Sequence, residues 1–198
     1  DYAAQHSTNN FSSVSFASAT KGLSVLFGVG GAGLPLVSNA THYFRVRAIN
    51  RADIPSAFTA VQATATPAQA PAGVALSAPT AELITINWSA NNNSPNTIYR
   101  VQLATAADFT TVDKTQDSSP GAASLAFSGL TPNTAYYARV TAFAVSGPNQ
   151  VSAVSAGLAT LAKTLTGVIL SAPSTGSITA GWSTTNGPNT IYRVELAI

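Results

Sequence analysis

The side chains that could perform chemistry are few in this chain, and their spacing matches no active site. The sequence has two histidines, seven carboxylates and no cysteine. Metal-ligand spacings, a nucleophile on a sharp turn or a phosphate loop would indicate an enzyme, and none of these patterns occurs. We therefore predict that the protein is not an enzyme, with no catalytic, cofactor-binding or metal-binding residues and no cofactor.

Three carboxylates lie near one another in the sequence and are the best candidates for a cation site. Asp108, Asp113 and Asp117 offer the oxygen ligands that Ca²⁺ prefers. Their spacing follows no known calcium loop, and Lys114 lies among them. We interpret them as solvated loop charges.

A glycine-rich segment, Gly28–Gly33, has apolar residues on both sides. A phosphate-binding loop needs a helix N-terminus after it, so we reject a phosphate site. The stretch from Phe11 to His42 is four residues longer than its counterpart, 109–136. Two hypotheses stay open: it is a contact surface for a neighbouring module or chain, or a kinked strand with a loose turn. The residues of this possible assembly contact are Leu26, Phe27, Val29 and Leu34.

The elements that must position these residues are β-strands. Residues Leu130–Phe143 pass from a Thr-Pro-Asn-Thr turn into a segment in which apolar and polar side chains alternate, as in a half-buried strand. Tyr136 lies six residues after Leu130. There its phenol can pack inside and hydrogen-bond back to the turn, as in the tyrosine corner of sandwich domains.

The sequence repeats itself with a period of 94 residues. The recurring blocks are Leu36–Asn50 with 130–144, Gly73–Thr80 with Gly167–Ser174, and Trp88 with Trp182. A period of this length is typical of whole domains in tandem rather than of solenoid repeats. In the first copy His42 takes the place of Tyr136, and we interpret it as a packed, hydrogen-bonded substitute rather than as a ligand.

Within the complete copy, strand signals recur at short intervals and no helical period appears. We predict an all-β sandwich of seven strands, near residues 73–78, 83–89, 98–104, 109–114, 123–128, 135–144 and 152–161. The predicted structural core consists of Trp88, Tyr99, Leu130, Tyr136 and Val140, with Trp182 and Tyr192 in the next copy.

A Trp in the second strand, a Tyr that opens the third, and Leu-x-Pro-x-Thr-x-Tyr followed by Arg-Val-x-Ala together resemble the fibronectin type III family. By this resemblance the chain contains the C-terminal part of a first module (1–66), a complete module (67–163) and the N-terminal part of a third (164–198). The resemblance implies tandem sandwiches that act as spacers, ligand-binding platforms or links in an extracellular fibre, and it implies no enzyme. Arg51-Ala52-Asp53 lies where some members carry an Arg-Gly-Asp attachment tripeptide, but Ala replaces Gly, so we predict no integrin-type binding.

The composition indicates a nearly neutral surface. Only 8% of the residues are charged, the net charge is +2, and the chain has neither Cys nor Met. The basic residues form no stripe for nucleic acid, and no apolar run is long enough to span a membrane. We expect an extracellular or cell-surface location, on a microbial cell.

We predict a structural or adhesive segment of a tandem-repeat surface fibre. Its expected partners are other copies of itself or neighbouring modules, and a cell-surface protein or polysaccharide. The half modules are either a window cut from a longer array, or the C-terminal strands of one molecule complete the N-terminal half sandwich of the next. Lateral packing is a further mode of assembly. The alternative function is a spacer or accessory module of a secreted polysaccharide-degrading enzyme.

Overall fold

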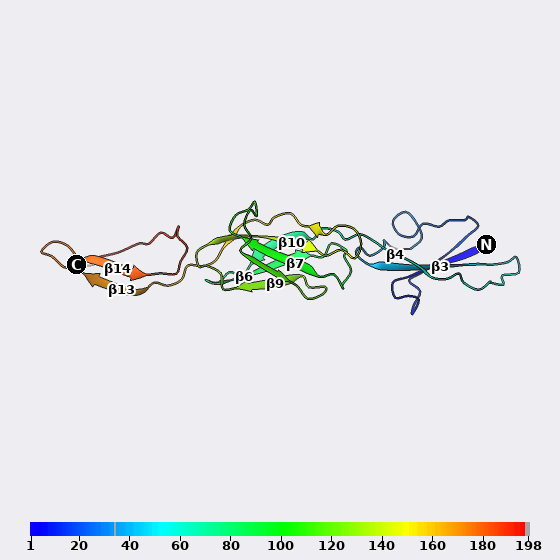
Figure 1. Cartoon of the computed structure of the whole chain (residues 1–198), viewed down its shortest axis with the longest axis horizontal. Coiled ribbons are helices and arrows are strands. Elements are labelled where there is room, and N and C mark those ends of the chain that lie inside the picture. The colour runs from blue at the N-terminus through cyan, green and yellow to red at the C-terminus, as the bar shows by residue number, and fades with distance from the viewer. Residues whose placement is uncertain (34, 197–198) are drawn as a thin grey trace.

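Three units follow one another along a single axis in the computed structural model, which describes residues 1–33 and 35–196 (Figure 1). The N-terminus and the C-terminal hairpin lie at opposite ends of this elongated molecule (Figure 1). The described residues form fourteen β-strands and no helix, which confirms the predicted all-β class. Leu34, one of the predicted contact residues, lies outside the described residues.

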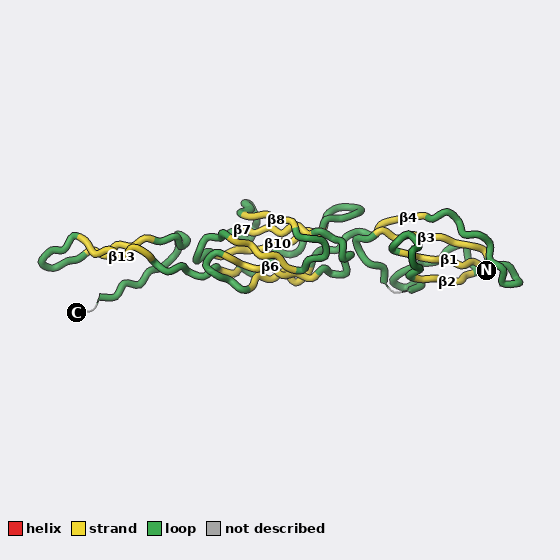
Figure 2. Tube along the Cα trace, turned by 90° about the horizontal axis from the view of Figure 1, so that it is seen from below, coloured by secondary structure: helices red, strands yellow, loops and turns green. Residues whose placement is uncertain are grey.

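The central unit is a sandwich of two antiparallel sheets (Figure 2). One sheet has the order β5 (Ala72–Ser77), β6 (Leu83–Ser89), β9 (Ser124–Ser128). The other has the order β11 (Gln150–Val151), β10 (Ala135–Ala142), β7 (Tyr99–Ala104), β8 (Lys114–Asp117), and β12 (Leu158–Ala159) also pairs with β10.

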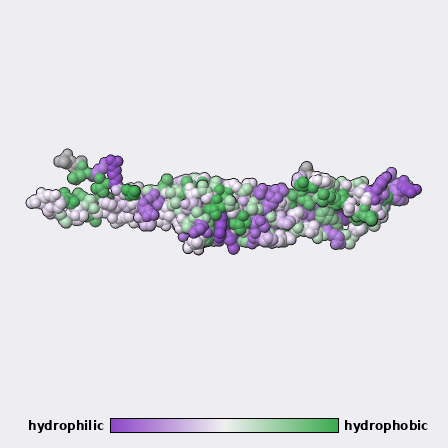
Figure 3. Space-filling view, turned by 90° about the horizontal axis from the view of Figure 1, so that it is seen from above, coloured by the Kyte–Doolittle hydropathy of each residue, from purple (hydrophilic) through white to green (hydrophobic). Residues whose placement is uncertain are grey.

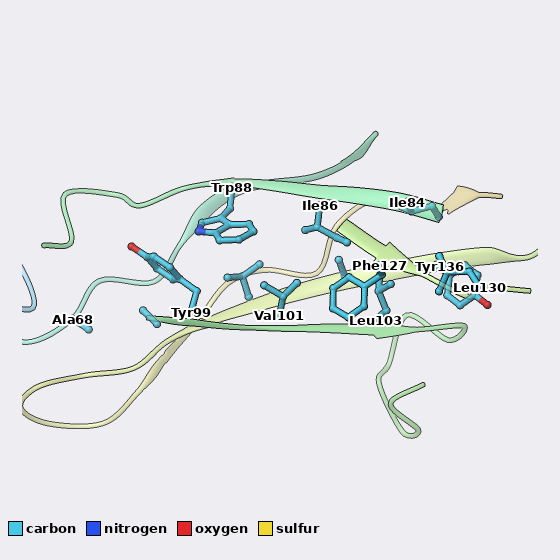
Figure 4. Close-up of a cluster of buried hydrophobic side chains, with 13 residues drawn as sticks. Ala68, Ile84, Ile86, Trp88, Tyr99, Val101, Leu103, Phe127, Leu130 and Tyr136 are labelled. Carbon is cyan, nitrogen blue, oxygen red and sulfur yellow. The ribbon is translucent and has the colours of Figure 1, made fainter. Parts of the chain in front are cut away.

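The core of this unit lies between the two sheets, because alternate residues of β6, β7 and β10 point inward. The Trp88 indole meets the Tyr99 ring edge-on, with 5.6 Å between the ring centroids (Figure 4). The Tyr136 hydroxyl accepts a hydrogen bond of 3.0 Å from the backbone N–H of Thr131. The remaining buried side chains of the cluster include Ile84, Ile86, Val101, Leu103, Phe127, Leu130 and Val140.

Two of the predicted strands are wrong in the central unit. The segment 109–114 is a loop that reaches β8 only at Lys114, because Phe109 adopts a left-handed backbone conformation (φ 53°). Segment 152–161 contains only the short strand β12. There the Ser152 and Ser155 hydroxyls, rather than carbonyls, accept hydrogen bonds from the N–H groups of Val140 and Ala138 in β10.

The N-terminal unit is a single antiparallel sheet. Its strand order is β2 (Phe16–Thr20), β1 (Tyr2–Ser7), β3 (Thr41–Ala48), β4 (Gln62–Ala65). His42 replaces the corner tyrosine, and its Nε2 lies 3.0 Å from the carbonyl of Val37, in the turn before β3. His42 therefore has the packed, hydrogen-bonded role that the sequence predicts for it.

The C-terminal unit is a hairpin of β13 (Thr166–Ser171) and β14 (Thr179–Ser183). Trp182 and Tyr192, which the sequence predicts as core residues, are only partly buried. Their rings lie 5.6 Å apart, as those of Trp88 and Tyr99 do. They stay partly exposed because no second sheet covers the hairpin among the described residues.

Candidate functional site at the module junctions

The three carboxylates that the sequence offers as candidate cation ligands are engaged in local contacts instead. Asp113 accepts a hydrogen bond of 2.6 Å from the backbone N–H of Thr105. Asp117 forms an ion pair with Arg100 at 2.8 Å, and this contact lowers the pKa of the Asp117 carboxyl. No group of three or more His, Cys, Asp or Glu side chains that could hold a metal occurs in residues 1–33 and 35–196.

The side chains that stand out instead are asparagines at the boundaries between units. Asn39 lies in the turn before β3, in a left-handed conformation (φ 54°) that Asn tolerates better than most residues. It is 4% exposed. Its Nδ2 donates to Thr97 Oγ1 at 2.9 Å and to the carbonyl of Phe143 at 2.8 Å, and its Oδ1 accepts from the N–H of Val145 at 2.7 Å. One amide of the first unit thus makes three hydrogen bonds to the second.

A second asparagine fixes the linker to the central unit. Asn93 Nδ2 donates to the carbonyl of Gln69 at 2.8 Å, and its Oδ1 accepts from the N–H of the same residue at 2.8 Å. The backbone of Ser38 adds two hydrogen bonds across the boundary: its N–H donates to the carbonyl of Asn92 at 3.0 Å, and its carbonyl accepts from the N–H of Ser94 at 2.8 Å. These bonds form a short parallel bridge between the units.

The junction between the central and C-terminal units repeats this arrangement. Asn133 Nδ2 donates to Thr190 Oγ1 at 2.8 Å. Asn186 Oδ1 accepts a hydrogen bond of 2.6 Å from the N–H of Lys163, and its Nδ2 donates to the carbonyl of the same residue at 3.0 Å. The N–H of Gly187 donates to the carbonyl of Pro132 at 2.8 Å.

The two junctions correspond residue by residue. Each residue of the second junction lies 93 or 94 positions after its counterpart in the first. The pairs are Asn39 and Asn133, Asn93 and Asn186, Thr97 and Thr190, Ser38 and Pro132, Ser94 and Gly187, and Gln69 and Lys163. We call the two asparagines and the threonine of each junction the amide clamp. The linker 161–167 is held by the same kind of contact as the linker 66–73, through Lys163 in place of Gln69.

Sequence reasoning missed the amide clamp, although a signal was present. Asn39 and Asn133 align in the repeat, and so do the Pro-Asn-Thr segments that contain Thr97 and Thr190. Their composition is that of ordinary turns. Only the placement of two modules against each other shows that these side chains bond across a boundary.

The described residues of the predicted assembly contact differ in their exposure. Leu26 and Val29 are exposed. Phe27 is partly buried, with its ring centroid 5.5 Å from that of Phe44 and 5.9 Å from that of His6. It lines a groove of about 510 Å³ on the sheet face of the N-terminal unit, together with residues of β1 and β3.

The sequence of the central unit matches a known family. Residues 69–157 fit the model of the fibronectin type III domain. The central unit is a fibronectin type III domain. The match spans less than half of the chain, and the flanking units carry parts of the same repeat. Fibronectin type III domains occur in tandem arrays, where they typically serve as structural or adhesive modules; they are generally non-catalytic and commonly extracellular or at the cell surface.

Solved fibronectin type III arrays have a similar fold at low sequence identity. The two-domain segment of chicken tenascin is 14% identical, with a TM-score of 0.48, over 80% of this chain and 83% of that one. The chicken CNTN1 FN1–FN3 domains are 16% identical, with a TM-score of 0.39 and 81% of this chain covered; the match spans about half (55%) of that longer chain. The central array of RIM-binding protein is 19% identical over 91% of this chain and 66% of that one, with a TM-score of 0.37.

No curated protein sequence is detectably similar to this chain. No helix in the described part of the chain is long and apolar enough to cross a membrane.

Proposed function

We propose that this chain is a non-catalytic structural segment of a microbial surface fibre, in which fibronectin type III modules are held at fixed angles to form a stiff extracellular spacer. The observation that carries the proposal is the recurrence of the amide clamp at both junctions. Flexible arrays need few contacts between modules, since their linkers bend freely. Here asparagine side chains and backbone bonds join each unit to the next, and the asparagines of the first junction, Asn39 and Asn93, are buried.

The energetics favour a defined orientation at the first junction. Asn39 is buried, so bending away from Thr97 and Val145 would leave polar groups unpaired until water replaced their partners. An unsatisfied buried polar group costs about 1–3 kcal/mol. This cost opposes bending at the junction, while the weakly charged surface adds little repulsion between modules.

The alternative role in a polysaccharide-degrading enzyme lacks a matching surface. Binding of sugar rings calls for exposed aromatic side chains, and among the described residues Tyr2 is the one exposed large aromatic side chain. Tyr43 and Tyr137 are partly buried. Phe11 and Phe109 lie under the guanidinium groups of Arg45 and Arg139.

The stiffness can be measured directly as a distance distribution between two units. The chain has no native cysteine, so Ala57→Cys in the first unit and Ala107→Cys in the second give two exposed positions for spin labels. Pulsed electron paramagnetic resonance should give one narrow distribution. Asn39→Gly, which removes the amide but tolerates the left-handed backbone, should broaden it.

Asn96→Ala is the matched control, because this exposed asparagine lies beside Thr97 in the same loop. It should leave the distribution narrow. A broad distribution in the unsubstituted chain would refute the stiff-spacer proposal.

A further inference from the structure

Asn186 of the second amide clamp is followed by Gly187, and this is the one Asn-Gly pair in the chain. In such a pair the backbone nitrogen after the asparagine can attack the side-chain amide carbon, because glycine has no Cβ to hinder the approach. The counterpart pair at the first junction is Asn93-Ser94, in which the serine Cβ hinders this attack. The two clamps therefore differ in chemical stability although their hydrogen bonds correspond.

The packing of the second junction explains why residue 187 is a glycine. A Cβ at Gly187 would lie 2.6 Å from the Thr134 hydroxyl oxygen and 3.1 Å from the carbonyl oxygen of Asn133. At the first junction Ala40 takes the place of Thr134, so no hydroxyl stands against Ser94. The contact with Thr134 thus brings the Asn-Gly pair with it.

In the closed junction the reacting atoms are engaged in hydrogen bonds. The Gly187 N–H donates to the carbonyl of Pro132 at 2.8 Å, and both polar atoms of the Asn186 amide bond to the backbone of Lys163. Attack requires the Gly187 nitrogen to lose its proton to hydroxide, and a buried, hydrogen-bonded N–H resists this loss. The reaction is therefore confined to molecules in which this boundary has opened.

The second junction should open more readily than the first. Pro132 has no N–H, so it accepts a bond across the boundary but donates none, whereas its counterpart Ser38 does both. Asn133 makes one hydrogen bond to the next unit in the described residues, and Asn39 makes three. Asn186 is partly exposed, and hydrophilic side chains lie at the surface of this boundary (Figure 3), so water reaches the amide once the bonds break.

We propose that Asn186 is a modification site, at which opening of the second junction is converted into a permanent change. The deprotonated Gly187 nitrogen forms a bond to the side-chain carbon of Asn186, and the side-chain nitrogen leaves as ammonia after it takes a proton from water. One water molecule then hydrolyses the cyclic imide at either carbonyl, which gives aspartate or isoaspartate. This inference goes beyond the proposed function, because it concerns how long the junction keeps its geometry.

Neither product can rebuild the clamp. A carboxylate has no N–H to donate to the carbonyl of Lys163, so one of the two bonds becomes a contact between two acceptors. In isoaspartate the backbone gains one methylene, which moves the Gly187 N–H away from the carbonyl of Pro132. The modified molecule therefore has a looser second junction.

The test is mass spectrometry of the full chain during prolonged incubation at mildly alkaline pH. Trypsin releases residues 164–193 as one peptide, whose fragment ions locate the product. Aspartate and isoaspartate should accumulate at Asn186 and not at Asn93. Asn133→Gly, which removes one bond of the clamp, should raise the rate about two- to tenfold, the factor that corresponds to one lost hydrogen bond.

A double variant provides the matched control. Gly187→Ser with Thr134→Ala installs the residues that the first junction has at these positions, so it preserves the packing and hinders the attack. It should lower the product at Asn186 to the level at Asn93.

Three results would overturn this inference: no product at Asn186, an equal rate in the unsubstituted chain and in Asn133→Gly, or undiminished product in the double variant. Each of them leaves the stiff-spacer proposal standing, because its distance distribution is measured across the first junction.

Discussion

The Nε2 atom of His6 lies 2.8 Å from the Nδ1 atom of His42 inside the N-terminal sheet. The bond of His42 Nε2 to the carbonyl of Val37 requires a proton on that nitrogen. In the neutral ring Nδ1 is then an acceptor, and His6 Nε2 must donate to it. The remaining nitrogen of His6, Nδ1, has no partner and is buried. Protonation of His6 would therefore place a second N–H at Nδ1, where the described residues offer it no acceptor.

The pair predicts an acid-sensitive N-terminal unit. His6 is 2% exposed and packs against Phe16, Phe27 and Phe44, none of which can carry a counter-charge. Burial, and then the proximity of His42, lower the pKa of His6 below its ordinary value of 6.5. The unfolded chain thus binds the proton more readily than the folded one, and stability is full above pH 6.5 and decreases as the pH falls toward the lowered pKa.

This acid sensitivity can be measured by thermal unfolding followed by circular dichroism at a series of pH values between neutral and mildly acidic. The double variant His6→Leu/His42→Tyr installs the residues of the central unit at both positions, and it should remove the dependence in this range. Equal pH dependence in the variant and the unsubstituted chain would contradict the assignment.

The two junction asparagines should differ in their contribution to stability. Asn39 makes three hydrogen bonds to the next unit, whereas Asn133 makes one in the described residues. We expect Asn39→Gly to lower the free energy of unfolding by about 1–3 kcal/mol, the cost of leaving buried partners unpaired. Asn133→Gly should cost less. Urea denaturation of both variants tests the order, and an equal or reversed order would argue against the clamp.

The ion pair at the second junction should matter little. Lys163 Nζ lies 2.6 Å from Glu82 Oε1, but both side chains are about half exposed (46% and 51%). Exposed pairs of this kind contribute about 0–1 kcal/mol. Lys163→Gln, which installs the residue of the first junction, keeps the backbone bonds to Asn186 and should leave the unfolding midpoint almost unchanged in low and high salt. A large loss would mean that the charge, and not the amide clamp, holds this boundary.

The two tryptophans should respond very differently to truncation. Trp88 is 5% exposed and packs on Tyr99, so Trp88→Ala should destabilise the central domain by about 3–5 kcal/mol, in line with other large-to-small core changes. Trp182 is partly exposed in a hairpin without a covering sheet, and Trp182→Ala should have a small effect in dilute solution. Guanidinium denaturation of each variant, followed by circular dichroism, provides the comparison.

Local patterns predicted the all-β class because the alternation in segments such as 83–89 and 135–142 is strong enough to specify which face is buried. The segment from Phe109 was mispredicted because its apolar ring suggests a strand, while its backbone is left-handed and its ring lies under Arg139. The amide clamp could not be predicted from local patterns, since it depends on how two modules meet. The first repeat copy also differs from the central domain, because histidines occupy positions where the central core has an aliphatic and a phenolic side chain.

The serine hydroxyls that bond to β10 have a consequence for the edge of its sheet. A continuous edge strand offers a row of free N–H and C=O groups onto which a foreign strand can add. In the segment after β10, the hydroxyls of Ser152 and Ser155 accept hydrogen bonds from N–H groups of β10. The edge of the sheet is therefore formed by two short strands, β11 and β12, instead of one continuous strand. This edge of the sheet therefore offers no long template onto which a strand of a neighbouring molecule could add.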